Sequence, residues 1–160
     1  MGADKDRILM CPPDYFTVDY VINPWMAGNE GSMSLDLAKR QWETLRDAIA
    51  EAAEVVTIEP QPELPDMVFT ANAGAVYGNR AIASHFMPHE RRPEEAHFKT
   101  WFRDNGFELL ALDEKIGFEG AGDCLHDRRG PWLWTGYGLS LIHISEPTRP
   151  PVASRMPSSA

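Results

Sequence analysis

The amino-acid sequence predicts an α/β fold in which the strands run in mixed directions. Two segments with a helical spacing of apolar residues alternate with short apolar runs of strand length, and several of these runs are followed closely by proline or glycine. The length of 160 residues favours one domain. A hydrophobic content of 43% and a charged content of 24% are typical of a globular protein.

Charge and composition exclude several classes of function. The formal net charge of −9 argues against nucleic acid or an anionic membrane as a partner. No apolar run reaches the roughly 18 residues of a transmembrane helix, and the start of the chain lacks the apolar stretch of a signal peptide. Two cysteines are too few for a disulfide scaffold. These features predict a cytoplasmic protein.

The first predicted elements are a strand, a long loop and a helix. Residues 7–10 form a short apolar run that stops at a Cys-Pro-Pro sequence, which predicts a buried strand. Residues 12–32 mix aromatics, prolines and glycines without a period, which predicts a long structured loop. Ser34 is expected to cap a helix with an apolar stripe, formed by Ala38, Trp42, Leu45, Ile49 and Ala52.

Further short apolar runs predict a series of strands. Residues 55–58 are expected to form one strand, which two prolines then end. Residues 67–69 and 74–77 are expected to form strands on either side of a polar interruption. The dipeptide Gly78-Asn79 then predicts a hairpin turn into a strand at residues 80–83.

A second helix is predicted to begin at Pro93, because proline suits the first turn and the two glutamates that follow suit its positive end. Its buried side is expected to carry three aromatics, Phe98, Trp101 and Phe102, and Gly106 is expected to end it. Residues 107–112 predict a final strand.

Three polar segments interrupt the apolar runs, at residues 20–26, 65–74 and 118–123. Each places a carboxylate or an amide beside small or apolar residues, where a hydrogen bond is strengthened by the low local dielectric. Such oxygens on one pocket wall suit a guanidinium, which offers a planar fork of donors and no acceptor. In the alternative interpretation, the side chains of Asp66, Asn23 and Asn72 only satisfy turn and loop backbone.

Other candidate sites carry weaker patterns. Asp123, Cys124 and His126 are too few for a structural zinc site, and no phosphate-binding loop or dinucleotide fingerprint is present. We therefore expect no metal and no cofactor. Cys11 has no partnered histidine in its neighbourhood and is expected to be a small buried residue. Residues 90–92 predict a solvated loop, from which an arginine could reach a substrate carboxylate.

Several stretches of the sequence together resemble the guanidino-group-modifying superfamily: residues 10–13 with 22–26, residues 66–74 and residues 118–123. This superfamily includes dimethylarginine dimethylaminohydrolase, arginine deiminase, arginine dihydrolase and the amidinotransferases. The resemblance covers nearly all of residues 7–138. It implies a five-bladed α/β propeller (the pentein fold) built of repeated ββαβ units around a central polar site, of which this chain would be a truncated part.

The resemblance also implies a hydrolase that acts on the guanidinium of arginine or a derivative, without metal or cofactor. In the family a cysteine thiolate attacks the guanidinium carbon, an amine leaves, and water hydrolyses the adduct. By matching position, Glu119 resembles the carboxylate beside the catalytic histidine, and Asp66 resembles a substrate-site acid. Arg91 resembles the arginine that binds the α-carboxylate, with Arg92 as an alternative.

The asparagines of the matched segments point to one branch of the family. Asn72 stands where deiminases and dimethylarginine hydrolases have an aspartate, and together with Asn23 it resembles the dihydrolase branch. The expected partner is a small guanidino compound, and the resemblance is compatible with a homo-oligomeric parent protein. An amidinotransferase and a non-catalytic fragment are the alternatives.

From Leu139 onward the apolar residues follow neither the helical nor the strand periodicity. Written as codons, residues 139–149 resemble a transposase sequencing adapter, and residues 154–160 match its next constant stretch in frame. We therefore expect residues 1–138 to be the N-terminal part of a guanidino-hydrolase-like propeller and residues 139–160 to be a disordered, non-native tail. The resemblance places the catalytic histidine and cysteine beyond residue 138, so the chain is expected to be inactive.

Overall fold

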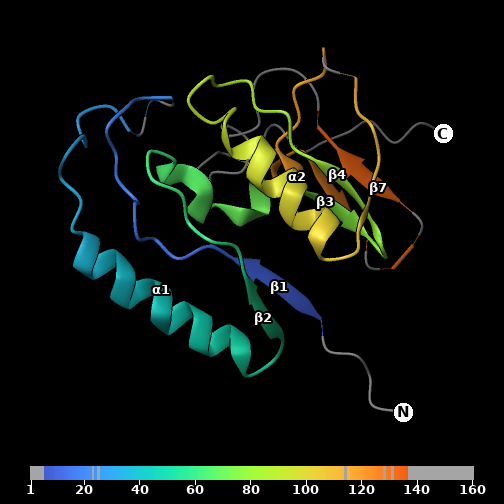
Figure 1. Cartoon of the computed structure of the whole chain (residues 1–160), viewed down its shortest axis with the longest axis horizontal. Helices are drawn as coiled ribbons and strands as arrows, with labels where there is room; N and C mark the ends of the chain where they lie inside the picture. The colour runs from blue at the N-terminus through green and yellow to red at the C-terminus, as the bar shows by residue number, and fades with distance from the viewer. Residues whose placement is uncertain are drawn as a thin grey trace.

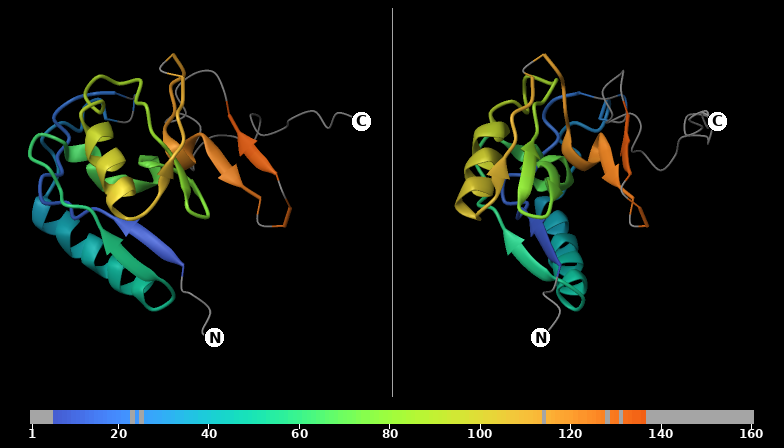
Figure 2. Two further views of the ribbon diagram at one scale, coloured as in Figure 1. Left: turned by 45° about the vertical axis from the view of Figure 1, so that its right-hand side comes forward. Right: turned by 90° about the vertical axis from the view of Figure 1, so that its right-hand side faces the viewer.

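The computed structural model describes residues 6–22, 24, 26–113, 115–127, 129–130 and 132–136. Within them lie two α-helices, seven short strands and three 3₁₀ helices, which confirms the α/β class. Among these residues, no helix is long and apolar enough to cross a membrane. Figures 1 and 2 show the first strands with α1 at one end of the molecule and the last hairpin at the other.

The first unit is a parallel pair of strands joined by a helix. Strand β1 (Arg7–Met10) pairs with β2 (Glu54–Thr57), and α1 (Leu35–Ala50) connects them along the outside (Figure 1). The Ser34 hydroxyl accepts from the Leu37 N–H at 3.3 Å, so the predicted cap is confirmed. No residue of α1 is fully buried, and the sheet against which it packs has only two strands.

The second unit has the order strand, strand, helix, strand. Strands β3 (Gly74–Tyr77) and β4 (Arg80–Ala83) form the predicted hairpin, with Gly78 at φ +60° in its turn. Helix α2 (Glu94–Asp104) then leads to β5 (Glu108–Leu109), which runs parallel to β4. Strand β5 is shorter than predicted, because β4 pairs with it through two residues alone.

A third pair of strands follows. Strand β6 (Cys124–His126) runs antiparallel to β7 (Leu133–Thr135). The segment before β6 is joined to the second unit by two backbone hydrogen bonds between His85 and Phe118, at 2.8 and 2.9 Å. These bonds bring residues near 119 against the end of β4.

The prediction of a strand at residues 67–69 is wrong. The chain there forms two 3₁₀ turns, η1 (Pro65–Val68) and η2 (Thr70–Asn72), held by bonds such as Phe69 N–H to the Asp66 carbonyl at 3.0 Å. A strand would direct Asp66 and Met67 to opposite faces, whereas the turn buries both. Pro65 favours this start, because its fixed φ suits a helical turn.

The core is formed where α2 packs on the second sheet. As predicted, Phe98 and Phe102 of α2 are buried, and they lie in one cluster with Phe86. Trp101 is only partly buried, and its indole N–H donates to the Thr57 carbonyl at 3.1 Å. That bond ties the second unit to the first. At the N-terminal end of α2, the preceding loop lies beside η1 and η2 and donates hydrogen bonds to both.

Candidate guanidinium site

Buried charged side chains gather at the N-terminal end of α2. Asp66 of η1, Arg91 of the preceding loop, Glu94 of α2 and Glu119 are each at most 3% exposed. We call these four residues the buried charge cluster. Asn72 of η2 joins it through hydrogen bonds. Residues from two of the three polar segments, 65–74 and 118–123, and from the loop at 90–92 are thus brought together by tertiary structure.

Arg91 is the centre of the cluster. Its Nε and Nη2 donate to the two carboxylate oxygens of Glu94 at 3.0 and 2.8 Å, a bidentate pair with both side chains at most 1% exposed. The guanidinium carbon also lies 4.2 Å from the centre of the Phe86 ring. The plane of the guanidinium is therefore fixed on two sides.

The other donors of Arg91 reach the two 3₁₀ turns. Nη2 donates to the Asp66 carbonyl at 3.2 Å, and Nη1 donates to Asn72 Oδ1 at 3.3 Å. The Asp66 carboxylate lies 3.8 Å from Arg91 Nε and accepts from the Tyr20 hydroxyl at 2.9 Å. The loop at residues 12–32 is thereby attached to the cluster.

The backbone of Glu119 is held from both sides by side chains. Asn72 Nδ2 donates to the Glu119 carbonyl at 3.1 Å, and the Glu119 N–H donates to Asp123 Oδ2 at 2.7 Å. The next residue, Gly120, has φ +63° and opens the 3₁₀ turn η3 (Gly120–Gly122). A Cβ at Gly120 would lie 2.6 Å from the Ala71 carbonyl oxygen, so only glycine allows this approach of η3 to η2.

Charge in the cluster is unbalanced, because one guanidinium faces three carboxyl groups. Burial raises the pKa of Glu94 to about 7, even though its bonds to Arg91 favour the ionised form. Burial also raises the pKa of Asp66, again against the pull of Arg91. The cluster therefore either holds a proton or carries surplus negative charge, and in both cases it favours an additional cation.

No family model matches the chain. ArgZ of Synechocystis sp., a bifunctional arginine dihydrolase/ornithine cyclodeaminase, is 54% identical over 145 residues, which are 91% of this chain and 21% of that protein. The N(G),N(G)-dimethylarginine dimethylaminohydrolase of Mycobacterium tuberculosis is 35% identical over 134 residues, which are 83% of this chain and 43% of that protein. The substrate-bound N-terminal domain of ArgZ matches with a TM-score of 0.80 and 54% identity, over 82% of this chain and 49% of that one.

The chain belongs to the guanidino-group-modifying superfamily. It matches the N-terminal region of these relatives and spans at most about half of their length, with 49% as the largest share. Its mixed α/β fold is that of the ArgZ N-terminal domain. Its sheets, of two, three and two strands, remain small and do not close a ring in the described part of the chain.

The structure brings four of the five predicted guanidino-superfamily site residues together: Asp66, Asn72, Arg91 and Glu119. The fifth, Asn23, lies outside the described residues. Nε, Nη1 and Nη2 of Arg91 all donate within the protein, so its binding of a substrate carboxylate stays a prediction. Arg92 is exposed, and its Nε donates to the Phe86 carbonyl at 3.2 Å.

Sequence reasoning missed Glu94 as a member of the site. It predicted Glu94 only as a charge at the helix start, whereas the structure buries this side chain completely. The available signal was its spacing of three residues from Arg91, which allows an ion pair across one turn. Tyr20 was missed as well, because its partner Asp66 lies 46 residues away.

Neither of the two cysteines has the character of an activated thiolate. Cys11 is fully buried, as predicted, and burial raises the pKa of its thiol to about 12. Burial also raises the pKa of Cys124. In the part of the chain that the structure describes, no group of three or more histidine, cysteine, aspartate or glutamate residues could hold a metal ion.

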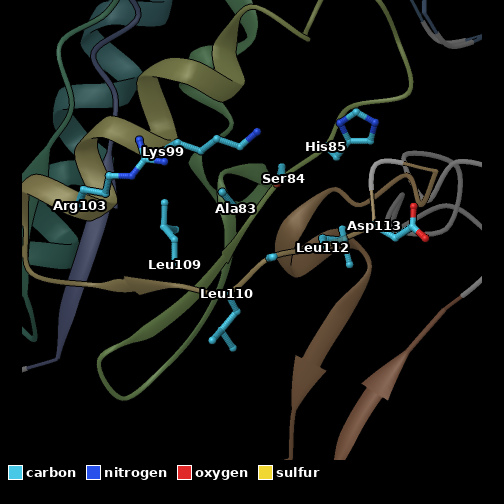
Figure 3. Close-up of a pocket in the computed structure, with 10 residues that line it drawn as sticks. Ala83, Ser84, His85, Lys99, Arg103, Leu109, Leu110, Leu112 and Asp113 are labelled. Atoms are coloured by element: carbon cyan, nitrogen blue, oxygen red, sulfur yellow. The ribbon is translucent and has the colours of Figure 1, made fainter.

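A separate hollow of about 350 Å³ lies between the end of β4, helix α2 and residues 109–113 (Figure 3). It is lined by Ser84 and His85 after β4, Lys99 and Arg103 of α2, and residues 109–113. Glu95 accepts from Lys99 at 3.0 Å and lies 3.2 Å from His85 Nδ1, so the charge of Lys99 is paired within the protein. The hollow contains no member of the buried charge cluster.

Substitution of Gly120 tests whether the approach of η3 to η2 matters. Gly78→Ala should lower the free energy of unfolding by about 1 kcal/mol, because alanine must adopt a left-handed conformation there but its Cβ meets no other atom. Gly120 has a similar φ, and a Cβ there would also meet the Ala71 carbonyl oxygen. We therefore expect Gly120→Ala to lower the free energy of unfolding by about 3 kcal/mol. Urea unfolding of the two variants measures the difference. Equal losses would contradict the close contact.

The cluster also predicts a pH dependence of stability. Because the folded pKa of Glu94 lies above its ordinary value of 4.5, the folded chain binds more protons than the unfolded chain between these two pH values. The free energy of unfolding should therefore fall as the pH rises from about 4.5 to about 7 and then level off. The contribution of Glu94 is at most about 1.4 kcal/mol per pH unit.

Two variants isolate this contribution. Glu94→Gln cannot titrate, so it should lose that part of the slope in denaturant unfolding measured at several pH values. Glu95→Gln is the matched control, because Glu95 is the next residue of the same helix and its pKa is lowered rather than raised. A slope that persists unchanged in Glu94→Gln would show that this carboxyl does not retain a proton in the folded chain.

Proposed function

We propose that this chain is part of a hydrolase that cleaves guanidinium C–N bonds of arginine or a derivative, of the arginine dihydrolase kind. The observation that carries the proposal is the buried charge cluster, in which one arginine faces three carboxyl groups. A substrate guanidinium would supply the missing positive charge. The 54% identity to an arginine dihydrolase supports this choice of substrate class.

The cluster residues would divide the recognition of the substrate. Asp66 and Glu119 offer buried carboxylates to the guanidinium, and Asn72 with Asn23 offers amide groups. Arg91 forms the wall between them. For the substrate α-carboxylate, Arg92 is better placed than Arg91, because within the described residues only its Nε donates to the protein, whereas Nε, Nη1 and Nη2 of Arg91 all do.

The reaction would need a thiolate that these residues do not provide. In the proposed course, a thiolate attacks the guanidinium carbon, one C–N bond breaks and ammonia leaves, and water then hydrolyses the C–S bond to give citrulline and the free thiolate. For a dihydrolase the thiolate would attack the ureido carbon again: a second ammonia leaves, water cleaves the C–S bond, and the resulting carbamate loses carbon dioxide to give ornithine. Both cysteines of this chain are buried with raised pKa values. The nucleophile and the catalytic histidine would therefore belong to a part of the parent protein beyond residue 138, and Glu119 would orient that histidine.

The order of the elements supports a propeller for the parent protein. Strands β3 and β4, helix α2 and strand β5 make one ββαβ unit. The elements β1, α1 and β2 are such a unit without its first strand, and β6 with β7 makes the first two strands of a third. Residues 1–138 would then be the first part of a five-bladed ring, and residues 139–160 a non-native tail.

Titration of L-arginine into the purified chain tests the proposal. Isothermal calorimetry should detect binding, and Asp66→Asn should weaken it at least tenfold, about 1.4 kcal/mol, because the carboxylate that meets the guanidinium loses its charge. Asp104→Asn, at the exposed end of α2, is the control and should leave the affinity unchanged.

The same samples can be analysed for ammonia, citrulline and ornithine. We expect none of these products, because neither cysteine is activated. Product formation by the chain alone would contradict the placement of the nucleophile. Wild-type chain that does not bind L-arginine would contradict the proposed substrate class.

A further inference from the structure

We infer that Glu94 is a positioning residue of the guanidinium site, which acts through Arg91 and Asn72 on the backbone of Glu119. This inference rests on the proposed function for its meaning, but it concerns a chain of contacts that can be measured without substrate. Glu94 stands at one end of this chain of contacts and was not predicted to belong to the site. Asp123 stands at the other end and was predicted only as part of the polar segment 118–123, without a role.

Glu94 is the member of the cluster that stands on the packed helix α2. It is the first residue of α2, and Phe98 and Phe102 one and two turns later are buried in the core. Its side chain is fully buried, and its two oxygens accept from Arg91 at 3.0 and 2.8 Å. A carboxylate on a packed helix is a rigid reference point for the flexible side chain of an arginine.

Arg91 transmits this position because its guanidinium is planar. Once Nε and Nη2 are bound to Glu94 and the Phe86 ring lies against one face, the direction of Nη1 is determined. That nitrogen donates to Asn72 Oδ1 at 3.3 Å. The amide of Asn72 is thereby oriented with its oxygen toward Arg91.

The orientation of Asn72 has a direct consequence for Glu119. With Oδ1 facing Arg91, the NH₂ group faces the Glu119 carbonyl and donates to it at 3.1 Å. Rotation of the amide by half a turn would place two oxygens against each other and two donors against each other. The Asn72 bond and the bond from the Glu119 N–H to Asp123 Oδ2 then fix the peptide groups on both sides of Glu119.

A purely structural ion pair predicts a different outcome from a positioning role. If Glu94 only stabilised the fold, its replacement would lower the melting temperature and leave the folded state of Asn72 and Glu119 unchanged. If Glu94 positions them, the folded variant should show altered signals from the Asn72 side-chain amide and the Glu119 backbone amide. Nitrogen-15 NMR of the full 160-residue chain measures both groups without substrate.

The decisive variant is Glu94→Gln, with Glu95→Gln as its matched control. We expect Glu94→Gln to shift the Asn72 side-chain signal and the Glu119 N–H signal, and to weaken L-arginine binding at least tenfold. Glu95 bonds to Phe86 N–H and Lys99 on the other side of the helix start, so Glu95→Gln should leave both signals and the affinity unchanged. A folded Glu94→Gln chain with unmoved signals would overturn the inference.

If Glu94→Gln does not fold, Asn72→Ala provides the test, because it leaves the ion pair of Arg91 and Glu94 intact. It should move the Glu119 signal and weaken L-arginine binding by a similar factor. In a folded double variant the two losses should not add, since both substitutions interrupt one chain of contacts. Additive losses, or an unmoved Glu119 signal in Asn72→Ala, would contradict the inference.

The two claims fail in distinguishable ways. Absence of L-arginine binding in the wild-type chain would refute the proposed substrate, while the amide signals of the variants would still report on positioning. Unmoved amide signals together with intact binding in the wild-type chain would refute the positioning role alone.

Discussion

The bidentate pair between Arg91 and Glu94 is the interaction on which the site depends. It lies entirely out of solvent, where two hydrogen bonds between opposite charges are short and strong and where either partner alone would be costly. The pair joins the loop before α2 to the helix itself. Through the remaining donors of Arg91 it also joins the helix to both 3₁₀ turns.

The geometry also explains why the cluster is not simply a stabilising ion pair. Asp66 and Glu119 add two further buried carboxyl groups, and Asn72 adds no charge. A fold selected for stability alone would have no reason to gather like charges in a place where water cannot solvate them. Burial raises the pKa values of both Glu94 and Asp66. The neighbouring carboxyl groups of Asp66 and Glu119 raise that of Glu94 further, which reflects the charge imbalance. A bound cation would relieve it.

Local signals in the sequence predicted the elements whose ends are set by local chemistry. Ser34 caps α1, Gly78 turns the hairpin, and Gly106 with φ +83° follows the end of α2, as their residue types require. The strand predicted at residues 67–69 failed, because a three-residue apolar run does not distinguish a strand from a turn. The need to bury Asp66 and Met67 together comes from tertiary packing.

The site was predictable as a set of residue types but not as an arrangement. The polar segments singled out Asp66, Asn72 and Glu119, and the resemblance added their expected roles. The ion pair between Arg91 and Glu94 depends on the packing of α2 against η1. No local sequence pattern predicts that packing. Exposed Arg92 and buried Arg91 are neighbours of one type, so only the structure distinguishes them.

The most direct test of the account is the number of protons exchanged when L-arginine binds. Calorimetry at about pH 6, in buffers with different ionisation enthalpies, gives this number from the dependence of the binding heat on the buffer. The account predicts a net release of protons, because burial raises the pKa values of Asp66 and Glu94 and a guanidinium placed beside them lowers these values. Binding without proton release would contradict the claim that this cluster is the receptor for a cation.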